Sequence, residues 1–207
     1  RTIISTGTKN LQDQLFHRDL PVVQAALGGG ARTALLKGRG NYLCVHRAGR
    51  LQEAPADTVA ARHLAVLHEV RLWQGRTRSG DLTEVEALED DSPLWPQLSS
   101  NTDNCLGTTC PRYGDCFIVK ARRAAQEADV VVVNHHLLFA DLALKEEGFG
   151  DVLPGADAFI IDEAHQVPEV AGQFFGTALS SRQLLELATD SRDEGVREAG
   201  DMAALRA

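Results

Sequence analysis

The chain has 207 residues, of which 43% are hydrophobic and 5% aromatic, and its formal net charge is −8. This composition is typical of an α/β chain with one or two folded domains. No apolar run approaches the roughly 20 residues of a membrane span, and the sequence contains no secretory signal segment. We therefore exclude a membrane protein and a secreted disulfide scaffold, and we expect a cytoplasmic location in which cysteines stay reduced.

The charge is distributed unevenly along the chain. Residues 1–50 contain eight Lys or Arg and two Asp or Glu, a balance of +6, whereas the remaining residues carry −14. Such an asymmetry suggests a basic face in the first fifty residues, with acidic helices elsewhere. A run of like charge most often forms a solvated face, so by itself the asymmetry does not indicate a nucleic-acid partner.

The predicted elements alternate between strand and helix and are then interrupted. Residues 2–5 predict a strand, a helix follows over about residues 9–18, and residues 34–36 form a second short apolar segment. Between residues 44 and 105, two sets of apolar side chains fall at helical spacing, so we expect an insertion of helices there. The two sets are Leu64, Leu67 and Val70, and Leu82, Val85 and Leu88.

The alternation resumes in the second half of the chain. Residues 117–128 predict a helix and residues 129–133 a strand, and Asn134 can cap the next helix. After a turn at Pro154 and Gly155, another apolar strand follows, and helices are expected from residue 166 onward. This order of elements predicts an α/β fold with a parallel sheet.

The most informative stretch is residues 158–165, where an apolar run ends in two adjacent carboxylates, Asp162 and Glu163. Such a run predicts a buried strand, and parallel sheets bind their ligands just past the carboxyl ends of their strands. In phosphoryl transfer one carboxylate holds Mg²⁺ and a second orients or deprotonates the attacking water. We predict Asp162 for the metal and Glu163 for the water. A solvated acidic turn is the alternative.

The four cysteines are Cys44, Cys105, Cys110 and Cys116, with sixty, four and five residues between them. In a reducing compartment such a set indicates metal ligation. Structural zinc sites usually contain pairs two to four residues apart, and only one gap falls in that range. A four-thiolate iron-sulfur cluster tolerates wider spacing, and Pro111 after Cys110 is similar to the Cys-Pro step of ferredoxins. The spacing favours a cluster over zinc.

Several stretches together resemble the iron-sulfur DNA helicases of the XPD and DinG group in superfamily 2, most closely the bacterial DinG/YoaA branch. Asp162-Glu163-Ala164-His165 is similar to motif II, the DEAH box or Walker B element. Residues 3–15 are similar to motif Ia, and residues 36–44 are similar to the segment that carries the first cluster ligand. Residues 130–138 are similar to the strand and helix start by which the chain re-enters the motor domain after the cluster domain. The matches follow the order of the family and cover about residues 1–170.

The resemblance implies part of a RecA-like parallel-sheet motor domain with an inserted, mainly helical iron-sulfur domain and the start of a helical arch domain. The implied boundaries are residues 1–43 and 118–170 for the motor, 44–117 for the cluster domain and 171–207 for the arch. The implied function is an ATP-dependent DNA helicase that moves 5′ to 3′ on single-stranded or forked DNA in repair or replication. Its cofactors would be ATP, Mg²⁺ and a [4Fe-4S] cluster held by the four cysteines.

The resemblance also suggests roles for single residues. His165 would couple the nucleotide state to the DNA side. The residues expected to contact the DNA backbone are Ser5, Thr6, Thr8, Lys9, Arg39 and Arg47. We interpret His135 and His136 as capping or packing residues, because neighbours on a helix point in different directions and cannot easily share one metal.

One part of a helicase motor is not found in the sequence. There is no phosphate-binding loop of the form G-x-x-x-x-G-K-[ST], and no second motor domain follows motif II. We therefore expect a fragment of a motor that does not hydrolyse ATP by itself. The alternative function is a non-catalytic zinc or iron-sulfur module that binds nucleic acid.

Overall fold

The computed structural model describes residues 1–53, 61–146, 148, 152–176 and 180–199. The chain divides into two compact units, Arg1–Val167 and Pro168–Ala207. The segments assigned to the motor and to the cluster domain lie in the first unit, apart from residues 168–170, and the segment assigned to the arch lies in the second. The domain boundaries themselves stay a prediction.

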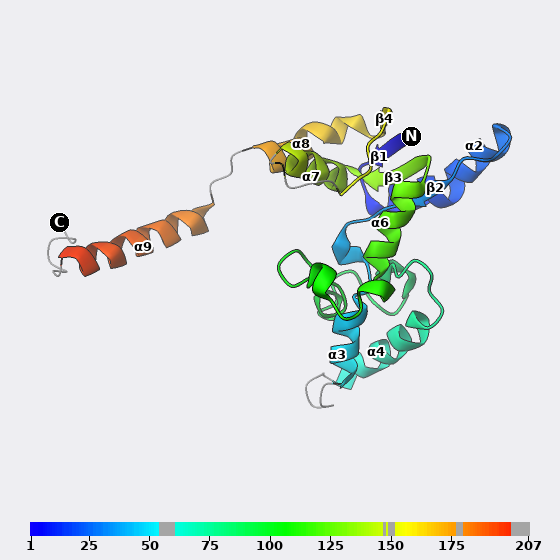
Figure 1. Cartoon of the computed structure of the whole chain (residues 1–207). Helices are drawn as coiled ribbons and strands as arrows, with labels where there is room; N and C mark the ends of the chain where they lie inside the picture. Colours follow the sequence, from blue (N-terminus) through cyan, green and yellow to red (C-terminus); the bar gives the residue numbers. More distant parts are fainter. Residues whose placement is uncertain (54–60, 147, 149–151, 177–179, 200–207) are drawn as a thin grey trace. The chain divides into compact units, whose positions relative to one another are not determined.

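A four-stranded parallel sheet organises the first unit, in the order β2-β3-β1-β4 (Figure 1). The strands are β1 (Thr2–Thr6), β2 (Thr33–Leu35), β3 (Val130–Asn134) and β4 (Ala158–Ile161). β1 pairs with β3 on one side and with β4 on the other. The valines of β3 from 131 to 133 are fully buried, as expected for a strand covered on both faces. The predicted α/β class and parallel sheet are confirmed. The prediction that the strand before Asp162 is buried was wrong, because β4 is an edge strand of the described sheet and its residues are exposed.

The helices that accompany the sheet are α1 (Lys9–Gln14), α2 (Leu20–Ala26), α6 (Phe117–Glu127) and α7 (His135–Glu146). A π-helical turn, Leu15–Asp19, joins α1 to α2, so the helix predicted over residues 9–18 extends to Ala26. Pro21 accounts for this turn. Its ring has no N–H to donate and crowds the preceding carbonyl, and a wider turn accommodates both effects.

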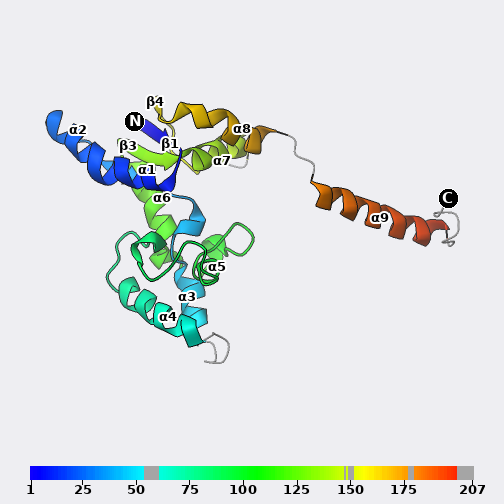
Figure 2. The same ribbon diagram turned by 180° about the vertical axis from the view of Figure 1, so that it is seen from behind.

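The segment between β2 and α6 contains α3 (Val45–Glu53), α4 (Ala61–Gln74) and α5 (Trp95–Leu98), which lie together away from the sheet (Figures 1 and 2). Helix α4 carries the first set of regularly spaced apolar residues, as predicted. Pro96 stands in the first turn of α5. The N–H groups of a first turn have no partner within the helix, so a proline is tolerated there.

The prediction of a helix through Leu82, Val85 and Leu88 was wrong. The chain forms only a short 3-10 helix, Leu82–Glu84, and continues in turns, although all three side chains are buried. Side chains supply the hydrogen bonds that a helix would have made. Asp81 accepts from the main-chain N–H of Thr83 (3.1 Å), and such local bonds compete with helix formation. The spacing therefore indicated a buried face but not a helix.

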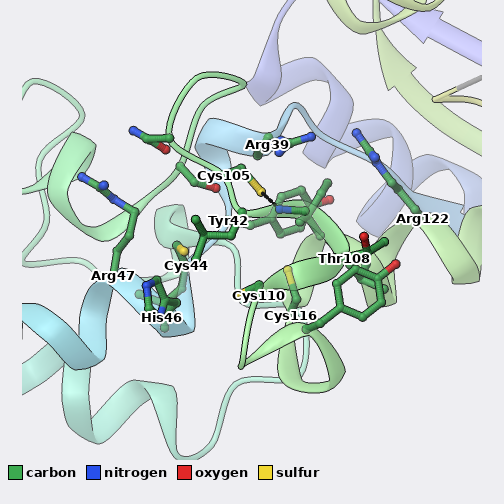
Figure 3. A pocket seen from close by; sticks show the side chains of 18 of the residues that line it. Arg39, Tyr42, Cys44, His46, Arg47, Cys105, Thr108, Cys110, Cys116 and Arg122 are labelled. Atoms are coloured by element: carbon green, nitrogen blue, oxygen red, sulfur yellow. Dashed lines mark hydrogen bonds between the residues drawn. The ribbon is translucent and has the colours of Figure 1, made fainter. Parts of the chain in front are cut away.

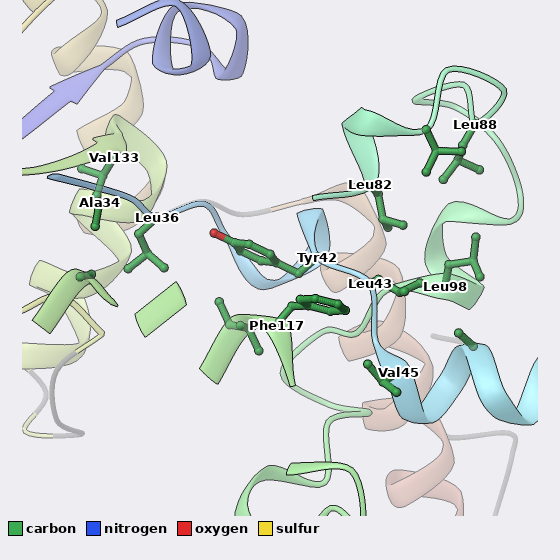
Figure 4. Packing of buried hydrophobic residues seen from close by; sticks show 14 of the residues in the cluster. Ala34, Leu36, Tyr42, Leu43, Val45, Leu82, Leu88, Leu98, Phe117 and Val133 are labelled. Carbon is green, nitrogen blue, oxygen red and sulfur yellow. The ribbon is translucent and has the colours of Figure 1, made fainter. Parts of the chain in front are cut away.

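One hydrophobic core runs from the sheet into the inserted segment (Figure 4). It includes Leu36 after β2, Leu43 just before the first cysteine, and Leu82 and Leu98 in the insertion, none of them more than 1% exposed. Phe117, which follows the last cysteine, also belongs to the core. The segment that carries the cysteines is thus anchored to the sheet by continuous apolar packing.

A buried ion cluster ties the same two regions together. Lys37, which follows β2, is 1% exposed, and its Nζ lies 2.8 Å from a carboxylate oxygen of Asp13 on α1 and 2.5 Å from Asp81 in the insertion. Burial by itself lowers the pKa of Lys37, but the hydrogen bonds to the two carboxylates outweigh burial and hold the pKa above its ordinary value. Burial also raises the pKa of Tyr42 to about 12, so its hydroxyl stays protonated while it accepts the Lys37 main-chain N–H (3.0 Å).

The second unit contains helix α9 (Ser181–Ala199) and nearly all of α8 (Val167–Phe175). Leu184, Leu185 and Leu187 of α9 are at least half exposed. Among the described residues, no helix combines the length and the apolar character needed to cross a membrane.

Replacing Lys37 with methionine should lower the free energy of unfolding by about 3–5 kcal/mol, because Asp13 and Asp81 would lose their counter-charge where water reaches them poorly. Urea unfolding followed by circular dichroism measures this change. Lys120→Met on the exposed side of α6 is the matched control and should cost less than about 1 kcal/mol. Equal, small effects of the two variants would contradict a stabilising role for the buried cluster.

Candidate functional site

The carboxyl ends of β1 and β4 meet at one edge of the sheet and bring motif Ia beside motif II. The main-chain N–H of Asp162 donates to the carbonyl of Ser5 (2.8 Å), which continues the pairing of the two strands by one residue. The Thr6 hydroxyl donates to the Asp162 carboxylate (2.9 Å). Asp162 therefore has a fixed position at the sheet edge, half-buried, with one oxygen held by a neutral donor.

Glu163 has an unusual backbone conformation. Its φ of 49° and ψ of 39° lie in the left-handed region, and no other non-glycine residue in the described part of the chain has a positive φ. Such a conformation costs about 1–2 kcal/mol and persists only where surrounding contacts hold it. The turn directs the Glu163 carboxylate outward, 36% exposed, with the Nδ1 of His165 3.4 Å away.

The turn after motif II also packs closely on motif Ia. A Cβ atom added at Gly7 would lie 2.3 Å from the side-chain oxygen of Gln166, so any larger residue there would require the Gln166 side chain to move. The two motifs are thus in direct contact at the sheet edge.

His135 belongs to this group of residues, although the sequence indicated only capping or packing. It is fully buried at the start of α7, and its Nδ1 lies 2.7 Å from the Ser5 hydroxyl. Its Nε2 is buried and has no hydrogen-bond partner among the described residues. Burial lowers the pKa of His135, and the main-chain groups of Asp162 and Glu163 oppose this effect in part. The sequence did contain a signal for this position of His135. Like Asp162, His135 comes at the end of an apolar strand, where parallel sheets place their functional residues.

The four cysteines line one cavity of about 410 Å³ in the inserted region (Figure 3). Cys44 comes from the start of α3, Cys105 and Cys110 from the loop before α6, and Cys116 from the position that caps α6. All four are half-buried free thiols. Residues separated by sixty positions in the sequence thus meet at one hollow of the surface.

The thiols are gathered more loosely than ligands of a single ion. Among the described residues, no three His, Cys, Asp or Glu side chains are placed to hold one metal ion. A zinc ion needs four sulfurs at about 2.3 Å from one centre. In a cubane cluster each cysteine binds a different iron, so the four sulfurs stand farther apart. The shared cavity and the four-thiol donor set fit such a cluster, while the tight convergence that a single ion needs is not found in the described residues.

The same cavity is lined by positive side chains. Arg39, Arg47, Arg122 and Arg123 line it, and no Asp or Glu of the described residues does so. Arg39 and Arg122 point toward one another in Figure 3. Burial lowers the pKa of Arg122, and the charge of Arg39 lowers it further. A cavity with this lining suits an anionic occupant, because a cluster with four thiolate ligands carries a net negative charge.

The residues predicted to contact DNA divide into three pairs. Thr8 and Lys9 are exposed beyond the end of β1, with the Lys9 ammonium 5.8 Å from the ring centre of Trp95 in the insertion. Ser5 and Thr6 are fully buried, with their hydroxyls directed to His135 and Asp162. Arg39 and Arg47 are half-buried beside the cysteines, and Arg47 donates to the Pro96 carbonyl (3.0 Å). DNA contact stays a prediction for all six.

Comparison with known proteins finds similar chains that are named ATP-dependent helicases, and one at 31% identity, from Bacillus subtilis, that is named 3'-5' exonuclease DinG. The chain is 53% identical to the ATP-dependent DNA helicase YoaA of Haemophilus influenzae over 192 residues, 92% of this chain and 30% of the relative. It is 52% identical to the protein of the same name in Escherichia coli over 190 residues, which are 92% of this chain and 30% of the relative. It is 36% identical to the ATP-dependent helicase DinG of Mycobacterium tuberculosis over 199 residues, which are 88% of this chain and 29% of the relative.

The chain therefore spans less than a third of the length of the curated relatives it matches. No family model matches the chain.

Proposed function

Because the chain belongs to the helicase family that contains YoaA and DinG, we propose that it supplies part of the motor of an ATP-dependent DNA helicase. The observation that carries the proposal is the 53% identity to a protein named ATP-dependent DNA helicase over 92% of the chain. The position of the DEAH tetrapeptide at the carboxyl edge of a parallel sheet supports it independently, since nucleotides bind at that edge in open α/β folds. Movement 5′ to 3′ and a role in repair or replication are further parts of the proposal, supported by the resemblance alone.

In the proposed mechanism Asp162 would hold Mg²⁺ and Glu163 would act on the attacking water. The Thr6 hydroxyl donates to one Asp162 oxygen and keeps it oriented. Glu163 is one residue farther along, and its left-handed turn separates its carboxylate from that of Asp162. Two carboxylates in different environments can take different roles, one binding the metal and one accepting a proton from the attacking water. ATP would thus lie over the carboxyl ends of β1 and β4.

We also propose that Cys44, Cys105, Cys110 and Cys116 hold a [4Fe-4S] cluster. The support is the shared cavity, the free thiols and the lining by arginine without a carboxylate. A bound cluster would cross-link the start of α3, the loop before α6 and the start of α6, which meet here with little regular structure. Arg39 and Arg122 would balance the negative charge of the four thiolates.

The proposed DNA path runs from motif Ia toward the cysteine cavity. Thr8 and Lys9 lie at the exposed end of β1, and Lys9 faces Trp95 of the insertion. Arg39 and Arg47 continue the positive charge to the cavity. Single-stranded or forked DNA is the proposed ligand, because a basic track beside an exposed edge binds phosphates without regard to sequence. His165, exposed next to Glu163, is the proposed link between nucleotide state and the DNA side.

The metal proposal predicts colour and iron. Protein with the full sequence purified without oxygen should be brown and contain about four irons per chain, the content of one [4Fe-4S] cluster. Cys105→Ser should lose most of the iron, whereas Thr108→Ala, at the rim of the same cavity, should keep it. Iron analysis and the visible absorption spectrum measure both. One zinc and no iron per chain would refute the cluster.

The catalytic proposal predicts separate effects on binding and hydrolysis. In the full-length protein, Glu163→Gln should leave ATP binding within a few-fold of the wild type while ATP hydrolysis falls by about 100-fold or more, because the amide keeps the shape but cannot accept the proton. Glu127→Gln on exposed α6 is the matched control and should leave the rate unchanged. Turnover of Glu163→Gln near the wild-type rate would remove Glu163 from this role.

The DNA proposal predicts a change in salt dependence. Replacing Lys9, Arg39 and Arg47 with glutamine in the full-length protein should flatten the plot of log affinity against log salt by up to about 2 units, at about 0.7 per lost phosphate contact. Affinity for unrelated single-stranded sequences should fall to a similar degree. Fluorescence anisotropy at several salt concentrations measures both effects.

The matched control removes three charges elsewhere. Arg71, Arg76 and Arg78 lie in the insertion outside the proposed path, and their joint replacement with glutamine should leave the slope unchanged. Equal slopes for both triple variants would show that the positive balance of residues 1–50 is a solvated surface.

A further inference from the structure

His135 is a buried, ionisable side chain that the mechanism above does not use. It is 0% exposed and lies between the end of β1 and the turn of motif II. A buried imidazole with one unpartnered nitrogen is uncommon, because burying a polar atom without a partner is unfavourable. The surroundings of this ring therefore call for an explanation beyond packing.

The Ser5 hydroxyl can pair with either tautomer of the neutral ring, so the groups around Nε2 decide between them. The Ser5 hydroxyl lies 2.7 Å from Nδ1, and the described residues offer it no other side-chain partner. If this hydroxyl donates to Nδ1, the ring proton lies on Nε2, which then needs an acceptor. The acceptors that act on the ring are the main-chain groups of Asp162 and Glu163, which are near enough to raise its pKa but do not meet the geometry of a hydrogen bond.

The main-chain groups of Asp162 and Glu163 belong to the turn in which Glu163 has its left-handed conformation. Glu163 is the residue with φ of 49°, and its left-handed conformation must be held by its neighbours. Ser5 holds the turn through its carbonyl, which accepts the Asp162 N–H, and Thr6 holds it through its hydroxyl. Each of these contacts fixes Asp162, whereas the described part of the chain holds the Glu163 carbonyl by a single main-chain bond, from the N–H of Gln166 (2.9 Å).

We propose that His135 is a positioning residue for motif II, which donates from Nε2 to a main-chain carbonyl of the Asp162–Glu163 turn and so sets the direction of the Glu163 carboxylate. A small movement of the ring or of the turn would complete this hydrogen bond, because Nε2 has no partner among the described residues. The Ser5 hydroxyl holds the ring in place and is compatible with the tautomer that donates from Nε2. The inference rests on the proposed ATP hydrolysis and adds a residue to it that touches neither ATP nor water.

Two amide variants separate the two ring nitrogens. The side-chain amide of Asn reaches the place of Nδ1, and that of Gln reaches the place of Nε2. In the full-length protein, His135→Gln should keep kcat for ATP within about threefold of the wild type. His135→Asn should lower kcat by about 10- to 100-fold, the effect expected of a misplaced catalytic group, while KM for ATP and Tm stay close to those of His135→Gln. His68→Asn and His68→Gln on exposed α4 are the matched controls and should not change kcat.

The outcomes are distinct. Equal kcat for the Asn and Gln variants, or a higher value for Asn, would overturn the inference, because a purely structural ring would be replaced best at the nitrogen that bonds Ser5. If neither variant folds, Ser5→Ala decides: it should lower kcat several-fold because the ring loses the contact at Nδ1 that holds its position, and an unchanged kcat would overturn the inference. Absence of ATP hydrolysis in the wild-type protein would overturn the proposed function itself, and this inference with it.

Discussion

The pairing of β1 with β3 on one side and β4 on the other is the constraint on which the site depends. Parallel strands that start level also end level, so the residues after each strand meet at one edge of the sheet. Motif Ia, the start of α7 and motif II follow these three strands, and they are far apart in the sequence. Their polar side chains contact one another only because β1 lies in the middle. Thr6 and Ser5 then connect Asp162 and His135 to the same strand.

The insertion is attached to this frame by two different interactions. Apolar packing is continuous from Leu36 to Leu98, which holds the insertion against the sheet without fixing a register. The ion cluster of Lys37 is directional, since its ammonium contacts both Asp13 on α1 and Asp81 in the insertion. Removing the lysine would leave the poorly hydrated Asp81 carboxylate without its counter-charge, so the cluster favours one arrangement of the three segments. The position of the cysteine cavity relative to motif Ia follows from that arrangement.

The charge around the cysteine cavity differs from the net charge of the chain. The chain is acidic overall, yet four arginines and no carboxylate of the described residues line the cysteine cavity. The repulsion between Arg39 and Arg122, which lowers the pKa of Arg122, is a cost that an anion in the cavity would offset. Lys37, by contrast, belongs to the basic first fifty residues but is neutralised inside the protein. Only part of the positive balance of residues 1–50 therefore remains for a polyanion to bind.

The sequence by itself determined the α/β class, the parallel strands and the place of Asp162 and Glu163, because these depend on apolar runs and on the residues that end them. It also indicated that the four cysteines act together. It could not distinguish a helix from a series of turns through Leu82, Val85 and Leu88, since both bury every third residue and local side-chain bonds decided between them. Only the tertiary structure decided that Ser5 and Thr6 face inward and that His135 lies beside motif II. Those contacts join residues more than a hundred positions apart, and no local pattern records which strands become neighbours.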